Sequence, residues 1–64
     1  MDEAMELTLA INILERRIAE LNIQISKDYN SELEEELKKY IKYREEIYEG
    51  SRSLVRKIIN DFNN

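Results

Sequence analysis

The 64-residue sequence contains no cysteine, no histidine, no proline and no tryptophan, and it has a single glycine. Without cysteine the chain forms no disulfide, and without cysteine and histidine it lacks the thiolate and imidazole ligands of zinc and haem sites. The same absence removes the side chains that most often act as nucleophile or general base. We therefore expect a protein that is not an enzyme and that carries no cofactor and no metal.

The lack of proline and the single glycine leave few positions at which a helix would break. Charged residues make up 38% of the chain, and the hydrophobic fraction of 42% is too high for a disordered segment. No apolar run approaches the roughly 20 residues needed to cross a bilayer. Met1 is followed by two acidic residues rather than by a basic signal-peptide region. These features predict an all-α, cytoplasmic protein without membrane contact.

The first half of the chain carries two apolar rows. One row recurs at alternating spacings of four and three, and it consists of Leu7, Ile11, Leu14, Ile18, Leu21 and Ile25. This heptad pattern predicts a helix over about residues 3–26 with one stripe packed on another helix. Met5, Leu9 and Ile13 form a second row on a separate face. We predict that this second row is a homodimer interface.

A second helix is expected after a turn at about residues 27–30, where Asp and Asn favour non-helical backbone. Ser31 and Glu34 fit a capping box at its start. Two rows then repeat every seven residues, Leu33, Tyr40, Ile47, Leu54 and Ile41, Tyr48, Val55, Phe62. Gly50 could instead cap the helix and begin a separate short one. Both rows keep their phase across Gly50, which favours one continuous helix over about 31–61.

A short link between two helices normally returns the chain antiparallel, so the predicted fold is a single-domain αα-hairpin covering residues 1–64. A domain this small gains stability from oligomerisation, and we expect a four-helix bundle or coiled-coil-like dimer. The first helix would span about 36 Å and the second about 46 Å. The end of the second helix should therefore project beyond the first.

This projecting end is the predicted partner-binding site. Its residues are Arg52, Leu54, Val55, Arg56, Lys57, Ile58, Ile59 and Phe62. Residues 51–64 have a net charge of +2 and residues 1–50 a net charge of −6. An apolar patch with a basic rim suits an acidic protein partner. The alternative is that this end packs on the second subunit and completes the bundle.

Two further features concern charged side chains. Arg44 falls at an otherwise apolar heptad position, and it either pairs with Glu15 or extends to solvent. Glutamates between 32 and 36 precede lysines at 38, 39 and 42, and i, i+4 ion pairs on a solvated face explain this cluster better than a metal site.

In length and in the expected pair of helices, the chain resembles the Rop-type plasmid copy-number regulators, hairpins that pair into a four-helix bundle and bind RNA. In that family the basic and aromatic face lies on the first helix, where this chain has Arg16 and Arg17 beside Glu15 and Glu20. Our leading hypothesis is a small protein-binding regulator, inhibitor or adaptor that acts as a homodimer. The alternative is a nucleic-acid-binding dimer that uses Lys38, Lys39, Lys42 and Arg44, or Arg52, Arg56 and Lys57.

Overall fold

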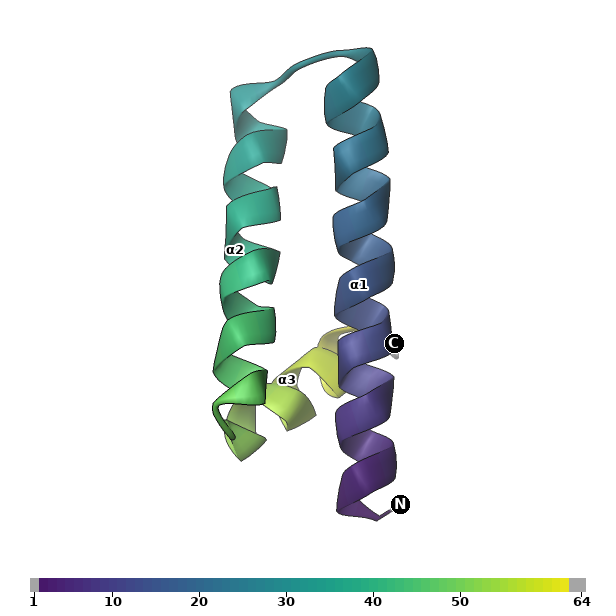
Figure 1. Ribbon diagram of the computed structural model, residues 1–64, viewed down its shortest axis with the longest axis vertical. Coiled ribbons are helices and arrows are strands. Elements are labelled where there is room, and N and C mark those ends of the chain that lie inside the picture. Colours follow the sequence, from purple (N-terminus) through teal and green to yellow (C-terminus); the bar gives the residue numbers. More distant parts are fainter. Residues whose placement is uncertain (1, 63–64) are drawn as a thin grey trace.

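The computed structural model describes residues 2–62, and these form three α-helices (Figure 1). The helices are α1 (Glu3–Lys27), α2 (Ser31–Tyr48) and α3 (Arg52–Phe62). α1 and α2 run antiparallel side by side, and α3 crosses the open end of this pair and contacts both helices. The described part of the chain has no strand, which confirms the predicted all-α class. Met1, Asn63 and Asn64 of the predicted 1–64 domain lie outside the described residues.

The bounds of α1 follow from its polar ends. The Asp2 carboxylate accepts a hydrogen bond from the backbone N–H of Met5 at 2.8 Å and caps the helix. Glu3 and Glu6 in the first turn and Lys27 in the last turn suit the helix dipole. The chain leaves the helix at Asp28, whose backbone is extended.

The start of α2 differs by one residue from the predicted capping box. Asn30 is the cap, and its side-chain oxygen accepts from the backbone N–H of Glu32 at 2.7 Å. Ser31 is consequently the first residue of the helix instead of its cap.

The predicted continuous helix over 31–61 is wrong, because α2 ends at Tyr48 and the chain turns at Gly50. The φ angle of Gly50 is +106°, a conformation that residues with a Cβ rarely adopt. The N–H of Gly50 donates to the carbonyl of Ile47 at 3.0 Å, and the N–H of Ser51 donates to Glu46 at 3.1 Å. These two bonds form a Schellman motif, which closes α2 and sends α3 in a new direction.

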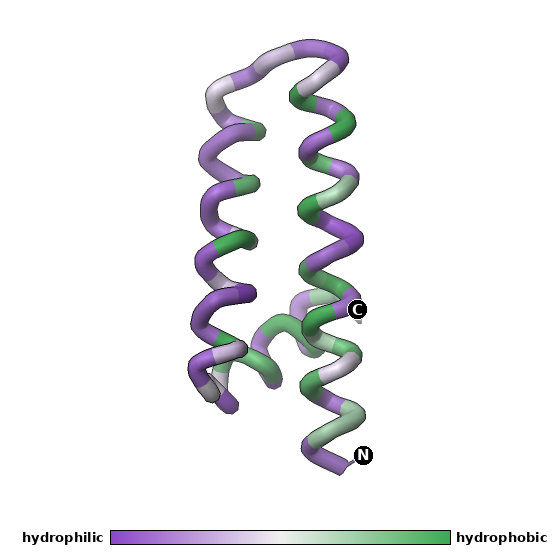
Figure 2. The backbone as a smooth tube through the Cα atoms, in the orientation of Figure 1, coloured by the Kyte–Doolittle hydropathy of each residue, from purple (hydrophilic) through white to green (hydrophobic). Residues whose placement is uncertain are grey.

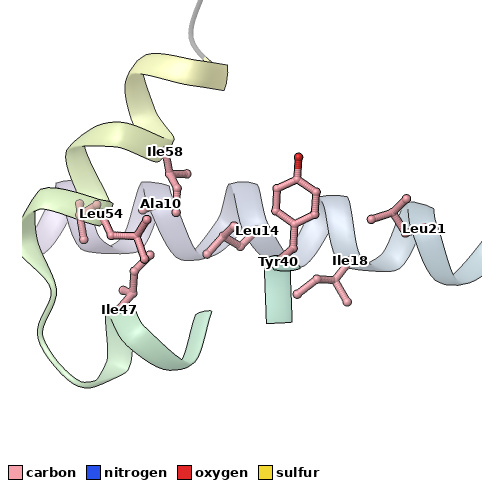
Figure 3. Close-up of a cluster of buried hydrophobic side chains, with 9 residues drawn as sticks. Ala10, Leu14, Ile18, Leu21, Tyr40, Ile47, Leu54 and Ile58 are labelled. Atoms are coloured by element: carbon pink, nitrogen blue, oxygen red, sulfur yellow. The ribbon is translucent and has the colours of Figure 1, made fainter. Parts of the chain in front are cut away.

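The core lies where the three helices meet, and most of its members can be followed in Figure 3. Its buried residues are Ala10, Leu14, Ile18, Leu21, Tyr40, Ile47, Leu54, Val55 and Ile58. Apolar residues of α1 and α2 line the facing sides of these helices (Figure 2). Ala10 was not predicted as a core residue, and Figure 3 places it beside Leu54 and Ile47.

The heptad row of α1 is buried in its middle and open at its ends. Leu14, Ile18 and Leu21 are core residues, while Ile11 and Ile25 are half-buried. Leu7 is 38% exposed. The prediction of one apolar stripe against a neighbouring helix therefore holds for the central turns of α1.

Candidate functional site

The predicted partner-binding residues do not project beyond α1. Because the chain turns at Gly50, α3 folds back, and Leu54, Val55 and Ile58 are buried in the core. Ile59 packs at the edge of that core. The predicted overhang is therefore wrong, and these apolar side chains complete the core of their own chain instead of offering a free surface.

The basic residues of the same set, Arg52, Arg56 and Lys57, line one hollow of about 640 Å³ together with Glu3 and Asp61. Arg52 faces α1, with Nη2 lying 3.8 Å from a carboxylate oxygen of Glu3 and 3.7 Å from one of Glu6. Arg56 and Lys57 are exposed. Only these two cations of α3 are thus left on the surface without a carboxylate partner among the ion pairs of residues 2–62.

The fold-back of α3 brings the basic residues of α2 and α3 together around aromatic rings. Nζ of Lys57 lies 5.8 Å from the ring centroid of Tyr43, and Nζ of Lys39 lies 5.0 Å from that of Tyr40. The rings of Tyr40 and Tyr43 meet edge to face at 6.0 Å. We name the area formed by Lys39, Tyr43 and Lys57 the basic–aromatic surface. Cations held over ring faces at these distances are attracted by the ring quadrupole.

A hollow of about 200 Å³ lies within this surface. Tyr40, Tyr43 and Phe62 contribute its apolar wall, and Asp61 contributes an acidic group. The Phe62 ring packs against Tyr40 at 5.9 Å, so the last residue of the predicted partner-binding set lies at the middle of α2. Phe62 remains 42% exposed. The hollow therefore offers an apolar wall beside two lysines.

The predicted dimer residues form a second surface on α1. Met5 is 58% exposed, and Leu9 and Ile13 are half-buried. Two adjoining hollows of about 430 and 450 Å³ follow this row and share Leu9 and Asn12. Phe62, Arg16, Arg17 and Glu20 complete the second hollow. We name the row of Met5, Leu9 and Ile13 with Phe62 the α1 groove.

An ion pair between helices occurs at Arg17 and not at the predicted Arg44. Nη2 of Arg17 lies 3.3 Å from Glu36 on α2, and Nη1 lies 3.5 Å from Glu20. The predicted Arg44–Glu15 pair is absent from the ion pairs of residues 2–62, and Arg44 is half-buried on α2. Desolvation lowers the pKa of Arg17, but the interactions with Glu36 and Tyr40 outweigh it and raise that pKa above its ordinary value.

Other candidate chemistry is sparse within the described range. No three carboxylates of residues 2–62 gather into a group that could hold a metal ion, and Glu34 of the acidic cluster pairs with Lys38 at 3.5 Å. No helix in this range has the length and apolarity required of a membrane span. The candidate sites among the described residues are therefore the α1 groove, the basic–aromatic surface and the hollow beside Arg52, Arg56 and Lys57.

The sequence predicted the apolar row of the α1 groove and named Lys39 and Lys57 in two separate basic sets, but it did not predict that these two lysines come together. The row of Met5, Leu9 and Ile13 is visible as a spacing of four residues. The approach of Lys57 to Tyr43 depends on the turn at Gly50, and the adjacent Gly50 and Ser51 were the only local sign of that turn.

Comparisons of the chain with protein-family models, with curated proteins and with solved structures gave no match in any of the three.

Proposed function

We propose that this chain is a small, non-enzymatic protein-binding regulator or adaptor that acts as a homodimer and binds an acidic segment of another protein. The observation that carries the proposal is the meeting of Lys57 and Tyr43, which places exposed cations beside an aromatic wall. Apolar contact with Tyr43, which lines this hollow, would supply affinity. Lys39, Lys57 and Arg56 would steer an acidic partner toward the site.

An acidic protein segment suits this surface better than a nucleic acid. The chain has a net charge of −4, and Asp61 lines the same hollow as the two lysines. Lys38 and Arg52, which the nucleic-acid hypothesis also requires, are engaged by Glu34 and by Glu3 with Glu6. Nucleic-acid binding relies on several cations free to contact consecutive phosphates. The arrangement therefore favours the protein-binding hypothesis.

A binding assay with defined probes tests this proposal. The first probe is a labelled amphipathic peptide rich in Glu and Leu, and the second is a labelled single-stranded RNA. Fluorescence anisotropy measures the binding. We expect the peptide to bind saturably, and we expect the Lys57→Glu variant to bind it about tenfold or more weakly. The matched control is Lys27→Glu, which reverses an exposed charge at the C-terminal end of α1, away from α3. This variant should change the affinity for the peptide less than about twofold.

Two outcomes would contradict the proposal. Equal losses for Lys57→Glu and Lys27→Glu would show that only net charge matters. Tighter binding of the RNA than of the peptide, with a steep dependence on salt, would assign the surface to nucleic acid instead.

A further inference from the structure

The α1 groove remains uncovered by the chain's own helices. Met5 is 58% exposed even though α3 packs on the neighbouring side of α1 through Arg52 and Phe62. The two adjoining hollows extend from Asp2 at one end of the groove to Glu20 at the other. At about 1.5 Å per residue this distance is close to 27 Å, which is enough to accommodate several turns of a second helix.

The exposed row of α1 is complementary to its own reversed copy. Met5 and Ile13 both lie four residues from Leu9, and Asp2 and Arg16 both lie seven residues from it. If a second α1 packs antiparallel with Leu9 opposite Leu9, each Met5 faces an Ile13 and each Asp2 faces an Arg16. Apolar residues then meet apolar residues, and opposite charges meet at both ends.

We propose that the occupant of the α1 groove is α1 of a second copy of the chain, packed antiparallel about a two-fold axis at Leu9. This inference rests on the homodimer in the proposed function and specifies its interface. Met5 of one subunit enters the hollow lined by Leu9, Ile13 and Phe62 of the other subunit. Its thioether meets the exposed Phe62 ring, a contact that methionine makes favourably.

The charges on this face select the antiparallel orientation. A parallel pair in the same register would place Asp2 opposite Asp2 and Arg16 opposite Arg16. Like charges that face each other across a helix interface repel. Oδ1 of Asp2 accepts the hydrogen bond from the Met5 N–H that caps α1. Oδ2 therefore remains available to the Arg16 guanidinium of the second copy.

Disulfide trapping tests the register directly, because the natural chain has no cysteine. Only a residue near a two-fold axis lies within the Cα separation of about 4.4–6.8 Å that a bond to its own copy requires. We expect Leu9→Cys to oxidise rapidly to a covalent dimer. The matched control is Asn22→Cys, which adds one cysteine at an exposed position of α1 that lines neither hollow of the groove and should stay monomeric under the same oxidation.

A mixed pair tests the orientation. Met5→Cys and Ile13→Cys proteins, mixed before oxidation, should yield the heterodimer in excess over either homodimer, since equal residues would lie about 12 Å apart along the helix. A parallel interface would give the two homodimers instead. Asp2→Asn keeps the cap and Arg16→Gln keeps helix propensity, and each should weaken the dimer about two- to fivefold.

Sedimentation of the unmodified protein separates failure of this inference from failure of the proposed function. A dimer whose Leu9→Cys variant cross-links no faster than Asn22→Cys would overturn the register and leave the homodimer standing. A folded monomer at micromolar concentration would overturn both the homodimer and the interface. Binding of the acidic peptide by that monomer would still support the partner-binding part of the proposed function.

Discussion

Arg17 joins α1 to α2 through its polar contacts. Its guanidinium contacts Glu20 on its own helix and Glu36 on α2, and the side chains of Arg17 and Glu36 are 34% and 33% exposed. Partial exposure screens such a pair, so it contributes modestly to stability and more to fixing how α1 and α2 face each other. The same position lines the α1 groove, which links the pair to the proposed interface.

A double-mutant cycle of Arg17→Ala and Glu36→Ala should give a coupling energy of about 0.5–1 kcal/mol in urea unfolding. The coupling should fall as salt is raised, because the pair is partly solvated. The exposed pair Lys38 and Glu34 is the comparison, with an expected coupling of about 0.3–0.5 kcal/mol. Zero coupling at Arg17 and Glu36 would mean that the contact does not persist in solution.

Tyr29 and Glu34 interact across the start of α2. The Tyr29 hydroxyl donates to the Glu34 carboxylate, which lowers the pKa of Glu34 and raises the pKa of Tyr29, with Lys38 lowering the Glu34 pKa further. The lowered pKa stabilises the fold above the ordinary Glu range and loses effect as pH falls through the folded value. The raised Tyr29 pKa stabilises the fold below its ordinary value of 10.0 and loses effect as pH rises through the folded value.

We expect Tyr29→Phe to shift the pKa of Glu34 upward toward its ordinary value, measured by carboxyl chemical shifts in an NMR titration. Tyr48→Phe is the control, since Tyr48 is also exposed but is not among the groups that shift the pKa of Glu34. An unchanged Glu34 titration in Tyr29→Phe would show that the hydroxyl does not hold the carboxylate in solution.

At the scale of elements, the turn at Gly50 determines the architecture. The seven-residue rows kept their phase through Gly50, and this continuity indicated one helix. In the structure Ile47 and Leu54 are both buried although they belong to different helices. Each helix buries its own apolar stripe on the same core, so a regular spacing across a turn does not establish that the helix continues.

Gly50→Ala distinguishes the two architectures by the sign of its effect. In a continuous helix alanine would stabilise by about 1 kcal/mol. At a φ of +106° alanine should instead destabilise by about 1–2 kcal/mol, and this cost comes from the backbone because no atom lies within 4 Å of the added Cβ. Chemical unfolding monitored by circular dichroism measures the difference, and a stabilised variant would contradict the observed turn.

The bounds and the buried stripe of α1 could be predicted from local sequence patterns. The features that depend on the packing of α3 could not. The capping groups and the heptad row define α1 and its buried Leu14, Ile18 and Leu21. The burial of Ala10 and the meeting of Tyr40 with Phe62 arise only when α3 crosses the open end of α1 and α2. No spacing within the sequence records that crossing.

At the scale of the whole molecule, α3 supplies one wall of the core. Ile58 is buried to 1% exposure, and Ile58→Ala should cost about 2–5 kcal/mol of unfolding free energy, as should Leu14→Ala. Glu35→Ala, at an exposed position, should cost well under 1 kcal/mol. Urea unfolding compares the three variants. A small cost at Ile58 would indicate that α3 does not pack stably on α1 and α2.

The proposed homodimer predicts that stability depends on protein concentration, because mass action favours a folded dimer over the unfolded chain. We expect the melting temperature to rise between low and high micromolar protein when followed by circular dichroism. Met5→Ser should reduce this rise while changing the melting temperature little at the lowest concentration, since Met5 is already 58% exposed in one chain. Ile23→Ser, at a position 55% exposed beyond the α1 groove, should leave the rise unchanged. A melting temperature independent of concentration would mean that the single chain of three helices is stable alone. The α1 groove would then be free for another partner.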